Sequence, residues 1–231
     1  MIPDVETNQS ESSSLVVDVA WPVFASDADD SMPVDHGFVL FSALSQVLPW
    51  VHSNPEVGIH PLGGRLIGDR RMRLTETTQL VLRLPASAVR EVLDLSGKPL
   101  DIDGCRLQVG TPSVRALRPS QELVSRLVTI KNALSANALA LAASRELAAL
   151  GIVARVSIPT RAAAGSFEQK DRVAADPYVR RTLRVRDRLV VGYALHVEDL
   201  DPSDSVRLQA RGIGGRRRFG CGIFVPARPQ T

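Results

Sequence analysis

Four histidines are the side chains of this sequence best suited to proton transfer near neutral pH, because an unperturbed imidazole titrates at about pH 6.5. They are His36, His52, His60 and His196. The two cysteines, Cys105 and Cys221, form no CxxC pair and have no histidine cluster beside them. We therefore expect reduced thiols, no structural zinc site and no cofactor.

A second candidate for chemistry is the segment GIGGRRRFGCGIF at residues 212–224, which combines five glycines with three consecutive arginines. It is not a dinucleotide-binding motif, because Arg217 stands where the third glycine of G-x-G-x-x-G belongs and too little chain follows for a βαβ unit. It is not a P-loop either, because Cys221 occupies the lysine position.

The segment can still bind phosphate in another way. Its glycines allow backbone N–H groups to approach an anion, and Arg216, Arg217 and Arg218 supply charge and paired donors. Three arginines in a row suit successive phosphates better than one, which favours a nucleic-acid backbone. The structural alternative is a solvated surface hairpin.

The distribution of charge also favours an anionic partner. Residues 1–35 hold eight acidic residues and no Lys or Arg, so the rest of the chain has 28 basic against 17 acidic residues, a net charge of +11. Of the 28 basic residues, 25 are Arg, whose planar fork suits phosphate. No stretch is apolar enough for a membrane span and no signal peptide is visible, so we expect a cytoplasmic protein with no membrane partner.

The first half of the chain predicts the order β-α-β-β-α-β. An apolar, β-branched run at 15–24 predicts a strand, and the helical spacing of Phe38 and Phe41 predicts a helix that begins near Asp35 or His36 and is kinked or ended by Pro49. The other expected elements are a short strand and turn at 58–68, a strand at 77–85, a short helix at 86–97 and a strand or hairpin at 98–110.

The second half predicts a similar order. Residues 135–151 form the strongest helical pattern, rich in Ala and Leu and closed by Gly151. Residues 179–200 predict one bent strand, or two strands paired around Arg186-Asp187. The other expected elements are strands at 121–131, 152–159 and 219–226, a loop or long hairpin at 160–178, and a short helix at 201–212 capped by Asp201 or Ser203.

This repeated order of elements predicts an α+β fold of two tandem ferredoxin-like, or RRM-like, domains. We expect a disordered lead at 1–13, an N-terminal domain at 14–112, and a C-terminal domain at 113–231 that carries the glycine-rich loop at 212–222.

The sequence resembles the CRISPR repeat endoribonucleases, the Cas six family. The resemblance rests on a late glycine-rich loop in a tandem ferredoxin-like chain; its matching residues are Gly212, Ile213, Gly214, Gly215, Arg216, Arg217, Arg218, Phe219, Gly220 and Gly222. The segments VDHGFVLFSALSQVLPWVH and GIHPLGG resemble the Myxan-type branch of that family.

The resemblance implies an activity. The chain would bind the repeat stem-loop of precursor CRISPR RNA, cut it without metal by 2′-OH attack to leave a 2′,3′-cyclic phosphate, and retain the product in a type I Cascade-like effector. The implied partners are the repeat stem-loop, other Cascade subunits or a transposon-associated effector. The alternative is a non-catalytic subunit that holds the CRISPR RNA hairpin in such a complex.

Among the histidines, His36 matches the position where the resembling family places its catalytic histidine, and its place at a helix start predicts exposure. The alternative is a solvated helix-cap residue. His52 lies beyond Pro49, where packing or surface exposure is favoured over catalysis. His60 precedes Pro61 and shapes a loop or contacts RNA, and His196 fits an ordinary strand position.

One departure from the family concerns the residue that is paired with the catalytic histidine, which His36 matches in this chain. Family members often pair it with a tyrosine or lysine, but the first half of this chain has no tyrosine and only Lys98. Arginine is a poor general base because its pKa exceeds 12. For RNA binding we select the glycine-rich loop from Gly212 to Gly220, including Phe219, followed by Arg180, Arg181 and Arg184, with Arg70, Arg71 and Arg73 as a further group.

Overall fold

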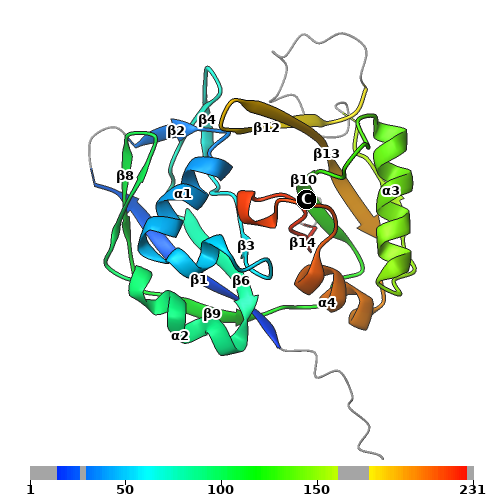
Figure 1. The fold of residues 1–231 in the computed structure, drawn as a ribbon, viewed down its shortest axis with the longest axis horizontal. Coiled ribbons are helices and arrows are strands. Elements are labelled where there is room, and N and C mark those ends of the chain that lie inside the picture. Colours follow the sequence, from blue (N-terminus) through cyan, green and yellow to red (C-terminus); the bar gives the residue numbers. More distant parts are fainter. Residues whose placement is uncertain (1–14, 27–29, 161–176, 228–231) are drawn as a thin grey trace, which may run out of the picture.

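The computed structural model describes residues 15–26, 30–160 and 177–227. The lead predicted at 1–13 and most of the loop predicted at 160–178 lie outside the described residues. Two antiparallel sheets form the body of the molecule, each with its own helices, and a small third sheet lies at one end (Figure 1).

The first sheet is built around the long strand β1 (Val16–Ala25), whose buried Trp21 lies in the core. The strand order is β3-β6-β1-β8-β7, and each of these neighbouring strands pairs antiparallel with the next. The bounds are β3 (Gly58–Ile59), β6 (Gln79–Pro85), β7 (Pro99–Ile102) and β8 (Cys105–Val109). With its two helices, the order β8-β1-β6-β3 is the ferredoxin-like order 4-1-3-2.

The second sheet has the same plan in the order β14-β10-β13-β11. Its strands are β10 (Leu123–Val128), β11 (Arg155–Ser157), β13 (Arg188–Glu198) and β14 (Val225–Pro226), and its helices are α3 (Ala136–Ala149) and α4 (Pro202–Arg211). The predicted tandem ferredoxin-like fold is therefore confirmed.

Helix boundaries follow local chemistry. The side chain of Ser135 accepts a hydrogen bond from the Ala138 N–H at the start of α3, and Gly151, at φ +69°, follows its end. Asp201 caps α4. In the first unit, α1 (Gly37–Val47) ends before Pro49, which begins the 3-10 helix η1 (Pro49–His52).

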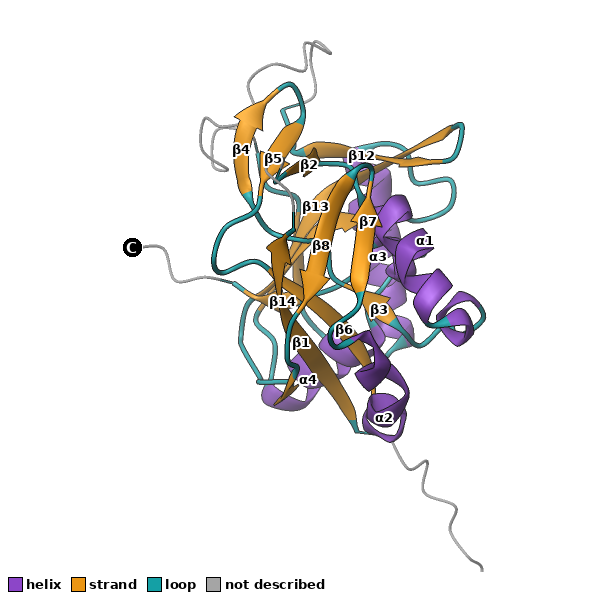
Figure 2. Cartoon of the chain, turned by 90° about the vertical axis from the view of Figure 1, so that its left-hand side faces the viewer, coloured by secondary structure: helices purple, strands orange, loops and turns teal. Residues whose placement is uncertain are grey.

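Two hairpins extend beyond the ferredoxin-like sheets. β2 (Ser31–Pro33), β4 (Arg65–Gly68) and β5 (Arg71–Arg73) form the third sheet in the order β2-β5-β4. Residues 179–200 form two paired strands, with β12 (Arg180–Val185) turning into β13 at Arg186-Asp187. The third sheet and β12 lie at the end of the molecule away from α2 (Val89–Val92) and α4 (Figure 2).

β9 (Ser113–Ala116), which follows the domain boundary predicted at residue 112, pairs with β1 of the first sheet. Two predicted elements need correction. The helix predicted at 86–97 is broken into two short 3-10 helices, Ala86–Ala88 and Leu93–Leu95, around α2. In the strand predicted at 219–226, only β14 pairs; the preceding residues turn through Gly220 and Gly222 at positive φ.

Arg83 joins the two units. Its guanidinium is 1% exposed and forms a bidentate pair with Asp18 at 2.7 and 2.8 Å. Its Nη1 also donates to the carbonyl oxygens of Gln209 and Phe224, in the second unit, at 3.0 and 2.7 Å. Because one buried charge satisfies acceptors on both units, it fixes their relative position.

Candidate functional site

His36 is buried, which corrects the expectation that it is exposed. It immediately precedes α1 and is 1% exposed. Its Nδ1 lies 2.9 Å from the Pro33 carbonyl oxygen, and its Nε2 accepts the Leu62 N–H at 2.9 Å. The first contact requires a proton on Nδ1 and the second a lone pair on Nε2, so these bonds define a neutral imidazole with both ring nitrogens occupied.

The electrostatics of His36 agree with this assignment. Burial, together with the positive charge of Arg126, lowers its pKa to about 4, although the bond to Pro33 works in the opposite direction. The ring is therefore neutral at pH 7. To accept a substrate proton, Nε2 would first have to release the Leu62 N–H, so His36 in this geometry holds the 60–64 segment against the start of α1.

His52 is the exposed histidine that lies beside the glycine-rich loop. It is the last residue of η1, where the neighbouring Val51 is fully buried and anchors the turn. Its ring lies 5.6 Å, centroid to centroid, from that of Phe41 on α1. The Arg218 guanidinium lies 5.4 Å from the same Phe41 ring. The Phe41 ring is thus a shared contact of an imidazole and a guanidinium from distant parts of the chain.

Phe219 fixes the loop against α1. Its ring makes edge-on contacts with Phe38 and Phe41, at centroid distances of 5.7 and 5.0 Å. Gly37 allows this approach, since a Cβ there would clash with the Phe219 carbonyl oxygen. Figure 1 shows the end of the chain, in red, next to α1. The predicted RNA contact Phe219 is therefore half-buried and supports the loop from inside.

The glycines of the loop serve close packing. Gly212, Gly214, Gly220 and Gly222 all have positive φ, and a Cβ on Gly212, Gly214 or Gly222 would clash with a backbone carbonyl oxygen. Only Gly215 of the five faces open space without a positive φ. The glycines other than Gly215 are needed for the conformation of the loop, because their positive φ angles disfavour any residue with a side chain.

Backbone N–H groups of these glycines are already used, which corrects the predicted phosphate cradle. Gly214 donates to Glu146 Oε2 on α3 at 2.6 Å. The other four donate to backbone carbonyl oxygens: Gly212 to Leu208, Gly215 to Thr129, Gly220 to Arg217 and Gly222 to Leu127. Any anion held by this loop must therefore be met mainly by arginine side chains.

The three consecutive arginines point to three different surroundings. Arg216 is exposed and left-handed at φ +67°, and Arg218 lies over Phe41. Arg217 turns inward, and its Nε and Nη2 are buried without a hydrogen-bond partner. Burial, with the nearby charges of Arg83 and Arg211, lowers its pKa to about 10, so it stays charged at neutral pH. Arg217 is therefore directed inward, and its contact with RNA stays a prediction.

The β12 arginines are similarly divided. Arg184 is exposed, and its backbone N–H donates to Asp35 Oδ2 at 2.7 Å. Arg180 lies on the same face of the strand, whereas Arg181 lies on the face of the buried Leu183 and has a buried Nε. Alternation along the strand therefore leaves Arg180 and Arg184 as the outward pair.

In the third sheet, two of the three predicted arginines support local structure. Arg71 donates to the Ser31 carbonyl oxygen at 2.8 Å, and Arg73 pairs with Asp30 at 2.6 Å. Arg70 lies in the β4–β5 turn at φ +56° and is exposed.

The remaining histidines occupy structural positions. His60 lies beside Asp18 and Arg83, with its Nε2 3.5 Å from Asp18 Oδ1, and burial lowers its pKa. Burial opposes ionisation of Asp18, but Arg83 and His60 outweigh it and hold the pKa of Asp18 below its usual range. The prediction that His196 occupies an ordinary strand position is confirmed, since it pairs with Val124 and Ser157 inside the second sheet.

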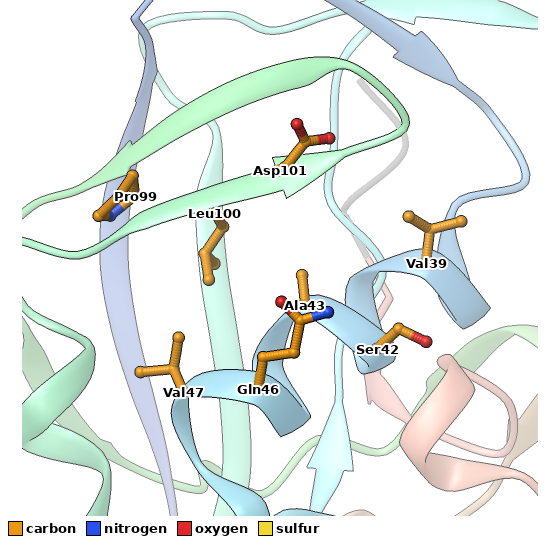
Figure 3. A pocket seen from close by; sticks show the side chains of 8 residues that line it. All are labelled: Val39, Ser42, Ala43, Gln46, Val47, Pro99, Leu100 and Asp101. Atoms are coloured by element: carbon orange, nitrogen blue, oxygen red, sulfur yellow. The ribbon is translucent and has the colours of Figure 1, made fainter.

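A groove of about 280 Å³ runs between α1 and β7 and is a poor place for an anion. It is lined by five residues of α1 and three of β7, including Gln46 and Asp101 (Figure 3). Its α1 residues face away from Phe38 and Phe41, which contact the loop. Among the described residues, no three His, Cys, Asp or Glu residues are grouped so that they could hold a metal ion, and no helix could span a membrane.

Two tandem ferredoxin-like units with an arginine-bearing, glycine-rich loop packed beside an exposed histidine define the class of protein. A family model described as "Cas6 Crispr" matches residues 17–229. The CRISPR-associated endonuclease Cas6 of Myxococcus xanthus (strain DK1622) is 37% identical over 212 residues, which cover 92% of this chain and 82% of that protein. The chain therefore belongs to the Cas6 family, and the resemblance found in the sequence is confirmed.

Solved structures agree on the fold. A CRISPR-associated protein Cas6 matches with a TM-score of 0.62 at 10% identity, covering 92% of this chain and all of that one. A Cas6-related protein from Pyrococcus furiosus gives 0.60 at 9% identity, covering 93% and 100%. A third, described as a RAMP protein binding different RNA substrates, gives 0.59 at 12% identity, covering 90% and 98%.

Sequence reasoning favoured packing or surface exposure for His52 and did not consider Arg126 or Glu146. The structure places His52 at the surface, in contact with the Phe41 ring. Arg126 and Glu146 gave no signal in the sequence, because both act through segments far away in sequence.

Proposed function

We propose that this chain is a cytoplasmic, metal-independent endoribonuclease that cuts precursor CRISPR RNA at the base of the repeat stem-loop. The family assignment and the name of the Myxococcus relative support processing of CRISPR RNA. The observation that supports the catalytic part is that His52, which is exposed, and Arg218 both contact the Phe41 ring.

In this mechanism the 2′-oxygen of the ribose attacks the adjacent phosphorus. A histidine takes the 2′ proton, the P–O5′ bond breaks, and the 5′-oxygen leaves with a proton from solvent, giving a 2′,3′-cyclic phosphate and a 5′-hydroxyl. Arg218 lies where a guanidinium can stabilise the negative charge that develops on the phosphorane.

Two histidines compete for the role of base. His36, selected from the sequence, could act only after the Leu62 N–H leaves its Nε2. His52 is exposed and needs no such rearrangement. We therefore assign the proton transfer to His52 and a structural role to His36.

Retention of the product in a Cascade-like effector belongs to the same proposal. An enzyme that keeps its product cuts only once. A slow site with one histidine and no tyrosine or lysine beside it is sufficient for such an enzyme. The non-catalytic alternative has the same RNA affinity and differs only in leaving the RNA intact.

Incubation of the protein with its repeat RNA in EDTA tests this function. We expect a single cut and a 5′ fragment whose 3′ end resists polyadenylation until acid opens the cyclic phosphate and phosphatase removes the resulting monophosphate. Intact RNA after long incubation, with binding retained, would establish the non-catalytic alternative. Cleavage that appears only after addition of Mg²⁺ would contradict the 2′-OH mechanism.

A further inference from the structure

Three arginines from separate segments lie around Asp35, and a fourth, Arg216, lies with one of them, Arg126, near the buried Cys221. We name Arg70, Arg126, Arg184 and Arg216 the arginine cluster; they come from the β4–β5 turn, β10, β12 and the glycine-rich loop. Asp35 Oδ2 accepts the Arg184 N–H, and the neighbouring Val34 N–H donates to the Arg70 carbonyl oxygen at 2.8 Å. All four side chains belong to exposed residues.

Three of these arginines are close enough to Asp35 for their charges to act on its carboxylate. Burial raises the pKa of Asp35, while Arg70, Arg126 and Arg184 oppose that rise through their charges. Arg126 and Arg216 both act on the buried Cys221, whose pKa burial raises to about 12.

A β-bulge directs Arg126 outward. Ser125 opposes Leu195 and Val128 opposes Tyr193, so Arg126 and Leu127 together oppose a single residue of β13. Leu127 enters a small core with Leu183 and Cys221, whereas Arg126 faces solvent. Bulges commonly redirect a side chain in this way beside functional sites.

The glycine-rich loop connects the cluster to the proposed cutting site. Its Arg216 belongs to the cluster, and the Arg216 carbonyl oxygen accepts the N–H groups of Phe219 and Cys221 at 2.8 and 3.3 Å, which fixes the turn. Two residues further along the chain, Arg218 lies over the Phe41 ring, which also contacts His52. Asp35 precedes α1 and His52 follows it, and an 11-residue helix is about 16 Å long.

The distance between the arginine cluster and His52 favours a polyanion over a small phosphate. A single small phosphate would contact one or two of the guanidinium groups and could not reach the others. A polyanion offers a negative charge at every nucleotide, and a few nucleotides cover the length of α1. The third sheet, whose β4–β5 turn carries Arg70, and β12, which carries Arg184, lie at the same end of the molecule (Figure 2).

We propose that the arginine cluster is a phosphate-binding site for the RNA strand, a few nucleotides from the phosphate that is cut beside His52. This inference rests on the proposed function and extends it to Arg126 and Asp35. Asp35 orders the cluster through its bond to β12, and it limits the affinity of the cluster by cancelling one positive charge.

The test measures the salt dependence of RNA binding. A fluorescein-labelled stem-loop RNA with single-stranded flanks is titrated by fluorescence anisotropy in EDTA between 50 and 200 mM salt. The variants are Arg126→Gln and Arg70→Gln, and Arg90→Gln, on the exposed surface of α2 at the other end of the molecule, is the matched control. Asp35→Asn keeps an acceptor for the Arg184 N–H while removing the negative charge.

Removal of one arginine–phosphate interaction should lower the log–log salt slope by about 0.7 to 0.9, so the decrease in affinity over this salt range becomes roughly threefold smaller. Arg126→Gln and Arg70→Gln should show this lower slope, and Arg90→Gln should keep the wild-type slope. Asp35→Asn should bind more tightly at low salt. Wild-type slopes in both cluster variants, or the same lower slope in Arg90→Gln, would overturn the proposal.

Failure of this inference can be told apart from failure of the proposed function. If the cluster variants keep the wild-type slope and the wild type still cuts its repeat RNA in EDTA, the endoribonuclease stands and the cluster is not its phosphate site. If the slopes fall as expected but the wild type leaves RNA intact, the cluster binds RNA and the catalytic assignment is wrong.

Discussion

Acidification should destabilise this protein through His36. The ring is neutral in the folded state, where its pKa is about 4 against about 6.5 in an unfolded chain. Because the folded pKa is lowered, the unfolded state binds the proton first, and the stabilising effect is complete above pH 6.5 and is lost as the pH falls toward 4. At 1.36 kcal/mol per pKa unit, the free energy of unfolding should fall by about 2.5 kcal/mol between pH 7 and about pH 4.5 from this group alone.

Urea unfolding of the wild type and of His36→Gln at both pH values isolates that contribution. Glutamine can still accept the Leu62 N–H but does not titrate, and the buried Trp21 gives a fluorescence signal from the first sheet. His60 and Asp18, whose pKa values are also lowered, remain in both proteins and cancel in the comparison. A variant that loses stability on acidification as steeply as the wild type would refute the assignment of a buried, neutral His36.

Two further substitutions test the scaffold. Arg83→Met removes the charge that joins the units and leaves Asp18 without its bidentate partner, so a loss of about 3–5 kcal/mol is expected in urea unfolding; a change below about 1 kcal/mol would show that the units are held otherwise. Gly222→Ala places a Cβ against the Ile213 carbonyl oxygen at φ +64° and should cost at least about 1–3 kcal/mol. Gly215→Ala, in open space, should stay within about 0.5 kcal/mol of the wild type by the same assay, and equal effects of the two alanines would contradict the packing role.

Local patterns were sufficient for most of the fold. The serine cap, the Ala- and Leu-rich run and the glycine at the end of α3 are contiguous in sequence, so that helix could be predicted with its ends. The hairpin at Arg186-Asp187 remained one of two alternatives, because a bent strand and a paired turn have the same pattern of residues. The pairing of β9 with β1 was missed because it joins residues almost a hundred positions apart.

The site was less predictable because its key contacts are long-range. The position of His36 at a helix start suggested exposure, but the N–H that covers its Nε2 comes from Leu62, in a turn 26 residues away. The glycine-rich loop indicated phosphate binding, but its N–H groups are taken by Glu146 and by distant carbonyl oxygens. The arginine-rich composition predicted an anionic partner. Only the fold shows that Arg217 turns inward while Arg216 and Arg218 remain at the surface.

Single-turnover cleavage of the repeat RNA in EDTA by His52→Ala, with His36→Gln as the matched variant, tests the central claim most directly. We expect His52→Ala to bind the RNA with wild-type affinity and to lose at least about a hundredfold in cleavage rate, the usual contribution of a positioned acid–base group. His36→Gln should retain most of the rate at neutral pH. A His52→Ala protein that cuts at the wild-type rate, together with loss of cleavage in a folded, RNA-binding His36→Gln protein, would contradict the account and return the catalytic role to His36.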